Sequence, residues 1–163
     1  METISVLVVD DEPGIAALCQ RVLSRADYDV VALTDPRAAI EHLQHHRLDL
    51  LVVDLPDVGA RYYTYQATML FCMEAAARAK LAFFVLDRPN PVGGRAVEGP
   101  ALRPGFESFC GVHDVAVRHG MTIGELAGLY REERGLDLEL TVISCRGWRR
   151  RMHQRDTGLP WVF

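Results

Sequence analysis

The sequence has little of several features that mark specialised classes of protein. Lys80 is the only lysine among its 163 residues. The apolar run near the start, Val6–Val9, is far shorter than a membrane span or a signal-peptide core, and no cationic segment precedes it. No P-loop, Gly-x-Gly-x-x-Gly motif or internal repeat is present. We therefore expect a soluble, cytoplasmic protein without a membrane partner.

Cysteine is also scarce, and its four positions show no C-x-x-C spacing. Cys19, Cys72 and Cys145 stand among apolar neighbours, whereas Cys110 does not. This pattern favours free, buried thiols, with a disulfide framework or a zinc site as the alternative.

Positive charge is limited overall, since the net charge is -4 and the pI is about 5.8. Such a balance gives no general attraction to nucleic acid, so we expect no nucleic-acid partner. One local exception is a basic run around Trp148, made of Arg146, Arg149, Arg150, Arg151 and Arg155. This run is either a patch for a phosphate backbone or a solvated tail.

What the sequence does contain is a regular alternation of short apolar runs and amphipathic segments. The predicted strands are Ile4–Val9, Asp29–Leu33, Leu48–Val53, Leu81–Leu86 and Leu138–Cys145. The predicted helices are Pro13–Arg25, Pro36–His46, Tyr65–Lys80 and Thr122–Arg134. This order predicts a single α/β domain, a three-layer, doubly wound and mostly parallel sheet of flavodoxin-like or Rossmann-like type, with Leu50–Asp54 as its central strand.

Carboxylates follow two of the predicted strands. Asp10 and Asp11 come after the first strand, and Asp54 comes after the third. If these strands are neighbours, the three acids meet at one edge of the sheet, where their hard oxygen atoms suit Mg²⁺. The alternative is that Asp10 and Asp11 cap the following helix and that Asp54 turns the chain.

Residues 4–58 resemble a two-component receiver domain, on the evidence of these same acids. The resemblance implies a weak Mg²⁺ site at Asp10, Asp11 and Asp54, with Asp54 accepting phosphate from a phosphoryl donor. A receiver also has a hydroxyl residue after its fourth strand and a lysine after its fifth. Here Asp87 follows the fourth strand and Arg146 stands after the last, so we expect a poor phosphate switch.

Residues 48–162 carry four motifs that agree in order and spacing with one family of glycoside hydrolases. They are DVGARYYTY at 57–65, DRPNPVGG at 87–94, VEGP at 97–100 and HGMT at 119–122. These motifs make this part of the chain similar to the exo-β-N-acetylmuramidases, which release N-acetylmuramic acid from peptidoglycan fragments. The resemblance implies the Rossmann-like N-terminal domain of that family, and a peptidoglycan-derived sugar as ligand.

Polar and aromatic residues of these motifs are the candidate sugar-binding residues. The resemblance assigns substrate binding to Asp57, Arg61, Tyr65, Arg88, Asn90 and His119. Their side chains suit hydroxyl, acetamido and carboxylate groups, and a tyrosine face stacks on a sugar ring. Each also has a structural explanation: a loop ion pair for Arg88, a turn for Asn90, and entry into a helix for His119.

Glycoside hydrolysis normally requires two carboxyl groups, and the candidates are Asp54, Asp87 and Glu98, with Asp57 as a further acid of the same motifs. The resembled family carries an additional glutamate-bearing segment upstream of the Asp57 motif, where this chain has its receiver-like residues. It also continues into a second domain beyond Pro160. The resemblance therefore implies a sugar-binding scaffold whose turnover is doubtful.

We interpret the chain as one fused α/β domain, with a receiver-like half at 1–54 and a truncated muramidase-like half at 55–163. The preferred function is that of an incomplete exo-β-N-acetylmuramidase-like domain. Two alternatives stay open, a receiver-type phosphoacceptor at Asp54 and a recombined or engineered chain without activity. The oligomeric state is not predicted.

Overall fold

The computed structural model describes residues 4–10 and 13–160. The chain divides into two compact units, Met1–Asp49 and Leu50–Phe163, and each is described by itself. In the described part of the chain, no helix is long and apolar enough to cross a membrane.

The first unit contains two strands and two helices. They are β1 (Ser5–Val9), α1 (Pro13–Ser24), β2 (Asp29–Leu33) and α2 (Pro36–His45). β1 and β2 run parallel, and α1 packs mainly on β2, where the Gln20 side chain donates to the carbonyl of Val30 at 3.1 Å. α2 begins at Asp35, whose carboxylate accepts from the backbone N–H of Arg37, with a proline at the first helical position.

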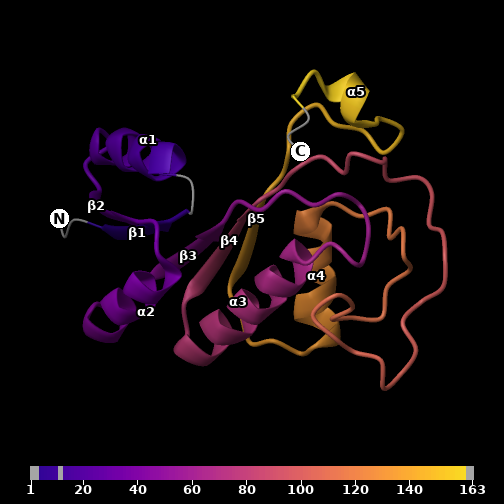
Figure 1. The fold of residues 1–163 in the computed structure, drawn as a ribbon, viewed down its shortest axis with the longest axis horizontal. Coiled ribbons are helices and arrows are strands. Elements are labelled where there is room, and N and C mark those ends of the chain that lie inside the picture. Colours follow the sequence, from indigo (N-terminus) through magenta and orange to yellow (C-terminus); the bar gives the residue numbers. More distant parts are fainter. Residues whose placement is uncertain (1–3, 11–12, 161–163) are drawn as a thin grey trace. The chain divides into compact units, whose positions relative to one another are not determined.

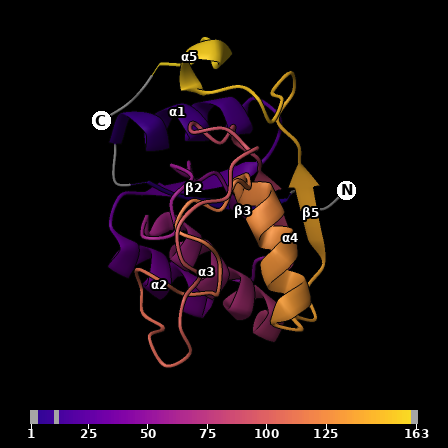
Figure 2. The same ribbon diagram turned by 90° about the vertical axis from the view of Figure 1, so that its right-hand side faces the viewer.

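The second unit contains three parallel strands in the order β3-β4-β5, drawn from magenta to yellow in Figure 1. Its elements are β3 (Leu50–Val53), α3 (Tyr65–Ala79), β4 (Ala82–Leu86), α4 (Ile123–Glu133), β5 (Leu140–Ile143) and the short α5 (Gln154–Thr157). Both crossovers step in the same direction, so right-handed connections place α3 and α4 on one face of the sheet. The two helices pack against each other there, as Figures 1 and 2 show.

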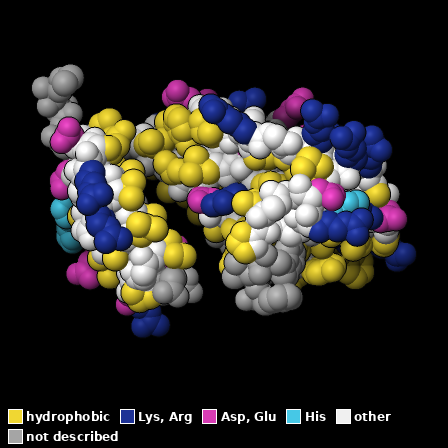
Figure 3. Space-filling model, turned by 90° about the horizontal axis from the view of Figure 1, so that it is seen from above, with side chains coloured by type: hydrophobic (Ala, Val, Ile, Leu, Met, Phe, Trp, Pro, Cys, Tyr) yellow, Lys and Arg dark blue, Asp and Glu magenta, His cyan; other side chains and the backbone are white. Residues whose placement is uncertain are grey.

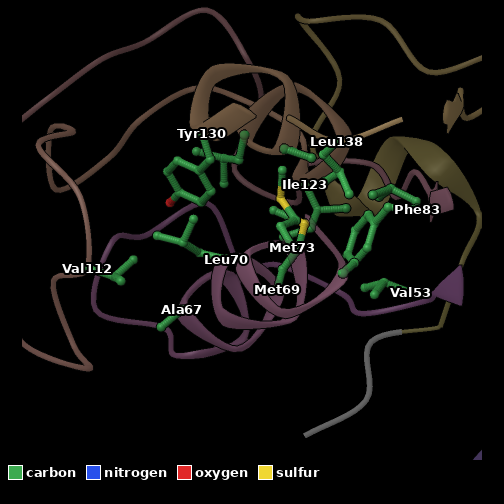
Figure 4. Close-up of a cluster of buried hydrophobic side chains, with 14 residues drawn as sticks. Val53, Ala67, Met69, Leu70, Met73, Phe83, Val112, Ile123, Tyr130 and Leu138 are labelled. Atoms are coloured by element: carbon green, nitrogen blue, oxygen red, sulfur yellow. The ribbon is translucent and has the colours of Figure 1, made fainter. Parts of the chain in front are cut away.

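The core of the second unit lies between this face of the sheet and the two helices (Figure 4). Phe83 and Val85 of β4 are fully buried against Met69, Leu70 and Met73 of α3, among others. Such alternation along β4 is the period-2 pattern of a strand with one covered face. Most of the apolar surface buried in this unit therefore belongs to α3, β4 and α4.

A series of hydrogen bonds crosses this core and gives the buried polar groups of Tyr130 and Gln66 hydrogen-bond partners. The hydroxyl of Tyr130 donates to Oε1 of Gln66 at 2.8 Å, and Nε2 of Gln66 donates to the carbonyl of Ala60 at 3.1 Å. Burial raises the pKa of the Tyr130 hydroxyl, and the nearby Asp57 carboxylate adds to the shift. The tyrosine is therefore a neutral hydrogen-bond donor at any ordinary pH.

The predicted strands and helices are confirmed, with bounds that differ by at most two residues at either end. The α/β class with parallel strands is confirmed as well. The helix cap predicted at Thr122 and Glu125 is present as a full capping box. The four cysteines are free, Cys110 being exposed and the others half-buried.

The expected arrangement of the strands needs a correction. Leu50–Asp54 is not the central strand of one sheet, because β3 is hydrogen-bonded only to β4 among the described strands, and β1 and β2 form a separate sheet. An apolar sequence predicts that a strand is buried on both faces. It does not specify which other strand is hydrogen-bonded to it. α5 was not predicted, since one helical turn leaves no periodicity to detect.

Candidate functional site

The carboxyl ends of β3, β4 and β5 lie at the same edge of the three-stranded parallel sheet, called here the carboxyl edge. Asp54 directly follows β3, Asp87 follows β4 and Ser144 follows β5. α4 also begins at this edge, since the N–H of Gly124 in its first turn donates to the Asp87 carboxylate that follows β4. Open α/β sheets bind their ligands at this edge.

Asp54 and Arg88 form an exposed ion pair at the carboxyl edge. Nε of Arg88 donates to Oδ1 of Asp54 at 2.6 Å, and Nη2 donates to Oδ2 at 2.5 Å. This bidentate geometry joins the residues that follow β3 and β4. The hydrogen bond to Asp54 raises the pKa of Arg88. Both side chains remain about half exposed, at 47% and 42%, so a ligand can reach them.

Asp87 has a positioning role. Its Oδ1 accepts from the backbone N–H of Arg88 at 3.1 Å and from that of Gly124, in the first turn of α4, at 2.8 Å. A carboxylate at this end of a helix is favoured by the orphan N–H groups and the helix dipole. The thiol of Cys145 lies 3.7 Å from Oδ2, and burial, followed by this carboxylate, raises the pKa of the thiol. Asp87 therefore ties β4, α4 and the end of β5 together.

Asp57 and His119 form a second pair, and this one is buried. Oδ2 of Asp57 accepts from the backbone N–H of Gly59 at 2.7 Å and lies 3.1 Å from Nε2 of His119, a contact without hydrogen-bond geometry. Nδ1 of His119 faces the backbone N–H of Met121 at 3.2 Å and accepts from it. A neutral imidazole then carries its proton on Nε2, toward the carboxylate. The pair holds the segment after β3 against the segment before α4.

Asn90 is 1% exposed and has both ends of its amide engaged. Nδ2 donates to the carbonyl of Met121 at 2.8 Å, and Oδ1 accepts from the N–H of Val92 at 3.0 Å. Gly59 passes so close that an added Cβ would stand 2.5 Å from this oxygen, and its φ of +80° also suits only glycine well. Gly59 and Asn90 thus hold the segment after β3 close to the segment after β4.

Glu98 and Arg61 are both engaged in loop contacts. Glu98 is joined to Arg118 by two backbone hydrogen bonds and by an ion pair of 2.5 Å from Nη1. Arg118 also donates to the carbonyl of Val92. Arg61 donates from Nη1 to the carbonyls of Pro100 and Val115, at 2.9 and 2.6 Å. These contacts give both residues a role in shaping the long segment between β4 and α4.

The tyrosines after β3 differ in packing and exposure. The rings of Tyr63 and Tyr65 meet edge to face with centroids 4.8 Å apart, and burial, with a smaller effect of Tyr65, raises the pKa of Tyr63. Tyr62 is 65% exposed, and Tyr65, the predicted ligand, is partly exposed. An exposed tyrosine face is available for stacking on a sugar ring.

The structure thus separates the sequence-predicted residues by accessibility. Asp57, Asn90 and His119 are buried and act as supports, whereas Asp54, Arg88 and Glu98 reach solvent. Arg118 and the role of Arg150 could not be predicted from the sequence. Both act across turns between residues at least twenty positions apart, so no local pattern marks them.

The predicted Mg²⁺ site stays a prediction. Asp10 belongs to the first unit and Asp54 to the second, while Asp11 lies outside the described residues. Within residues 4–10 and 13–160, no group of three or more His, Cys, Asp or Glu side chains is arranged to hold a metal ion.

The fold is that of a Rossmann-like α/β domain. The chain belongs to the family described as exo-beta-N-acetylmuramidase NamZ, N-terminal, whose model matches residues 16–163.

Relatives and solved structures agree with this assignment. The chain is 50% identical, over 115 residues, to the peptidoglycan beta-N-acetylmuramidase NamZ of Bacillus subtilis, an alignment that covers 71% of this chain and 28% of the relative. It superposes on two DUF1343 family proteins from Bacteroides fragilis. The first has a TM-score of 0.79 and 29% identity, with 98% of this chain and 49% of the other covered. The second has a TM-score of 0.68 and 28% identity, with 92% of this chain and 48% of the other covered.

A second similarity is shorter. Over 50 residues the chain is 40% identical to the alkaline phosphatase synthesis transcriptional regulatory protein PhoP of Bacillus subtilis, which covers 31% of this chain and 21% of the relative. The chain spans less than a third of either of these relatives and about half of the solved structures.

Proposed function

We propose that residues 50–163 bind the terminal N-acetylmuramic acid of a peptidoglycan glycan, as the substrate-binding half of a muramidase-type site. The observation that carries this proposal is the Asp54–Arg88 pair, which reaches solvent at the carboxyl edge, while Asn90 and His119 of the same motifs are buried. Membership of the NamZ N-terminal family and the identity to the B. subtilis enzyme support it.

The chemistry of the exposed pair suits this sugar. N-acetylmuramic acid differs from N-acetylglucosamine by a lactyl group that ends in a carboxylate, and a guanidinium is the preferred planar partner of a carboxylate. Arg88 contacts Asp54 through Nε and Nη2. Its Nη1 forms no hydrogen bond within the described residues, so this group can donate to the ligand carboxylate. The Asp54 carboxylate accepts from sugar hydroxyls on the same side.

Turnover requires more than these residues provide. A glycosidase needs one carboxyl group to protonate the leaving oxygen and a second to attack or to activate water. Asp54 is paired with Arg88, Glu98 with Arg118, and Asp87 with the N-terminus of α4. Since all three candidates have strong partners, we propose that these 163 residues bind the sugar without efficient hydrolysis.

Calorimetric titration tests the binding site directly. We expect N-acetylmuramic acid to bind more tightly than N-acetylglucosamine, and the Arg88→Gln variant to lose this difference. A charge-assisted hydrogen bond is worth about 1.5–3 kcal/mol, so the loss is about tenfold or more in affinity. A chromogenic N-acetylmuramide incubated with the same samples should stay at the rate of the protein-free control.

The matched control is Arg78→Gln, which removes an exposed arginine from the last turn of α3, at the opposite edge of the sheet. It should bind like the parent chain. Equal affinity for the two sugars, or an Arg88→Gln variant that keeps the preference, would contradict the proposed site. Turnover that disappears in Asp87→Asn would contradict the proposed absence of hydrolysis.

A receiver-type phosphoacceptor is the second candidate, and the similarity to PhoP is the observation that favours it. Asp54 would accept a phosphoryl group from a small donor, with Mg²⁺ held by Asp10 and Asp11. The cytoplasmic location expected from the sequence belongs to this candidate and stays a prediction, as does the alternative of a recombined or engineered chain.

We expect acetyl phosphate with Mg²⁺ to label Asp54 slowly and far below one phosphate per chain. The structure pairs Asp54 with Arg88 in a bidentate contact, which occupies both oxygens of the attacking carboxylate. Intact-protein mass spectrometry measures the labelled fraction. Complete labelling that Asp54→Asn abolishes would make phosphate uptake the leading function.

A further inference from the structure

The segment after β5 concentrates positive charge on one surface. Residues 146–155 include five arginines and no acidic residue, in a chain whose net charge is -4. The side chains of Arg146, Arg149 and Arg151 are exposed, and we call these three residues the arginine rim. Figure 3 shows Lys and Arg side chains gathered on the face that carries this C-terminal segment.

This segment is an ordered part of the second unit, anchored to the loops of the carboxyl edge. The N–H of Gly94 donates to the carbonyl of Arg150 at 2.7 Å, and the N–H of Gln154 donates to that of Pro91 at 2.9 Å. Nη1 of Arg150 donates to the carbonyl of Gly120 at 3.1 Å, and Nη2 pairs with Glu125. A solvated tail, the alternative considered from the sequence, would have none of these contacts.

The positive charge of the arginine rim is not neutralised by acidic side chains of the described residues. Within the described part of the chain, Arg146, Arg149 and Arg151 form no ion pair, whereas Arg150 next to them does. Holding like charges side by side on an anchored segment costs free energy that a flexible tail would avoid. An anionic ligand would offset this repulsion and form charge-assisted hydrogen bonds with the exposed guanidinium groups.

The arginine rim is also continuous with the candidate sugar site. The segment at 146–155 that carries the rim follows β5 at the carboxyl edge, and its Arg150 and Gln154 are hydrogen-bonded to residues 91–94, the continuation of the loop that carries Arg88. A polymer whose terminal sugar occupies the Asp54–Arg88 site is therefore in position to extend over the segment at 146–155. The ligand of the rim and the ligand of the site are then parts of one molecule.

We propose that the arginine rim binds the lactyl carboxylates of a peptide-free glycan strand beyond its terminal N-acetylmuramic acid. This inference rests on the proposed function, because that sugar sets the position of the strand. Such a strand carries one carboxylate in every disaccharide, which makes it a polyanion of regular spacing. The rim thus makes long strands better ligands than the single sugar.

The charge of the chain favours a glycan over nucleic acid as the ligand of the rim. The overall charge of -4 opposes a densely charged phosphate backbone, while a sparsely charged strand meets mainly the local rim.

Fluorescence anisotropy with end-labelled ligands tests the proposal on the full 163-residue chain. The ligands are peptide-free glycan strands, chitin oligosaccharides of equal length as the neutral match, and a DNA duplex. We expect the strands to bind at least about tenfold more tightly than chitin at low salt, with an advantage that falls as salt screens the charges. The triple variant Arg146→Gln, Arg149→Gln, Arg151→Gln should lose this advantage.

The control variant removes three exposed arginines from other parts of the same unit: Arg78→Gln, Arg103→Gln, Arg131→Gln. It has the same net charge as the rim variant and should keep the preference for strands. Equal affinity for strands and chitin, equal losses in both variants, or rim-dependent binding of DNA alone would overturn the proposal.

The titration with free N-acetylmuramic acid separates this inference from the proposed function. If the single sugar binds through Arg88 but strands bind no better, the rim inference fails and the site stands. If strands bind through the rim while the single sugar does not bind at all, the rim stands and the site fails.

Discussion

Replacing Phe83 with alanine is expected to lower the free energy of unfolding of the second unit by about 3–5 kcal/mol. Phe83 is fully buried at the centre of the core between the β3-β4-β5 sheet and the helices α3 and α4. Truncation removes the largest fully buried side chain of β4 and leaves a cavity that neighbours such as Met69 and Met73 fill only partly. A loss of this size is a large part of the stability of a small domain.

Urea denaturation followed by tryptophan fluorescence measures this change. Trp148 belongs to the second unit and the sequence of the first unit contains no tryptophan, so the signal reports on the second unit. Phe106→Ala is the matched control, because Phe106 is 69% exposed and its truncation should change stability by less than about 0.5 kcal/mol. Similar midpoints for Phe83→Ala and Phe106→Ala would show that the core has been misassigned.

Asp57→Ala is expected to lower the free energy of unfolding by about 3 kcal/mol and to weaken the binding of N-acetylmuramic acid as well. Its carboxylate accepts from the buried N–H of Gly59 and contacts His119, and removal of a partner leaves both polar groups buried without compensation. The segment after β3 then loses its connection to the segment before α4, and with it the support of the Asp54–Arg88 pair.

Two further variants separate the roles of Asp57. Asp57→Asn keeps an oxygen that can accept from Gly59, so we expect it to recover part of the stability. Asp114→Ala removes an exposed carboxylate and should leave both stability and binding unchanged. If Asp57→Ala unfolds at the parent's urea concentration, the buried pair does not hold these segments together, and the loops are fixed by other contacts such as those of Asn90.

The strands and helices of this protein could be predicted from local sequence patterns. Val30 and Phe83 lie in strands, and Met69 and Leu126 lie in helices, within the ranges that apolar periodicity predicts. The cap at Thr122 was equally predictable. These features depend on residues a few positions apart, and such local contacts are written directly in the chain. The motifs that indicate the muramidase family are likewise stretches of contiguous sequence.

How these elements combine, and which polar residues a ligand can reach, could be read only from the folded structure. Asp57 and Arg88 looked alike as candidate ligands in the sequence, yet the fold buries the first and exposes the second. The pairing of β3 with β4 and the hydrogen bond from Arg150 to Gly120 were likewise seen only in the structure. Burial and pairing are set by contacts between segments far apart in the chain, and the type of a residue does not specify the partner that the fold brings to it.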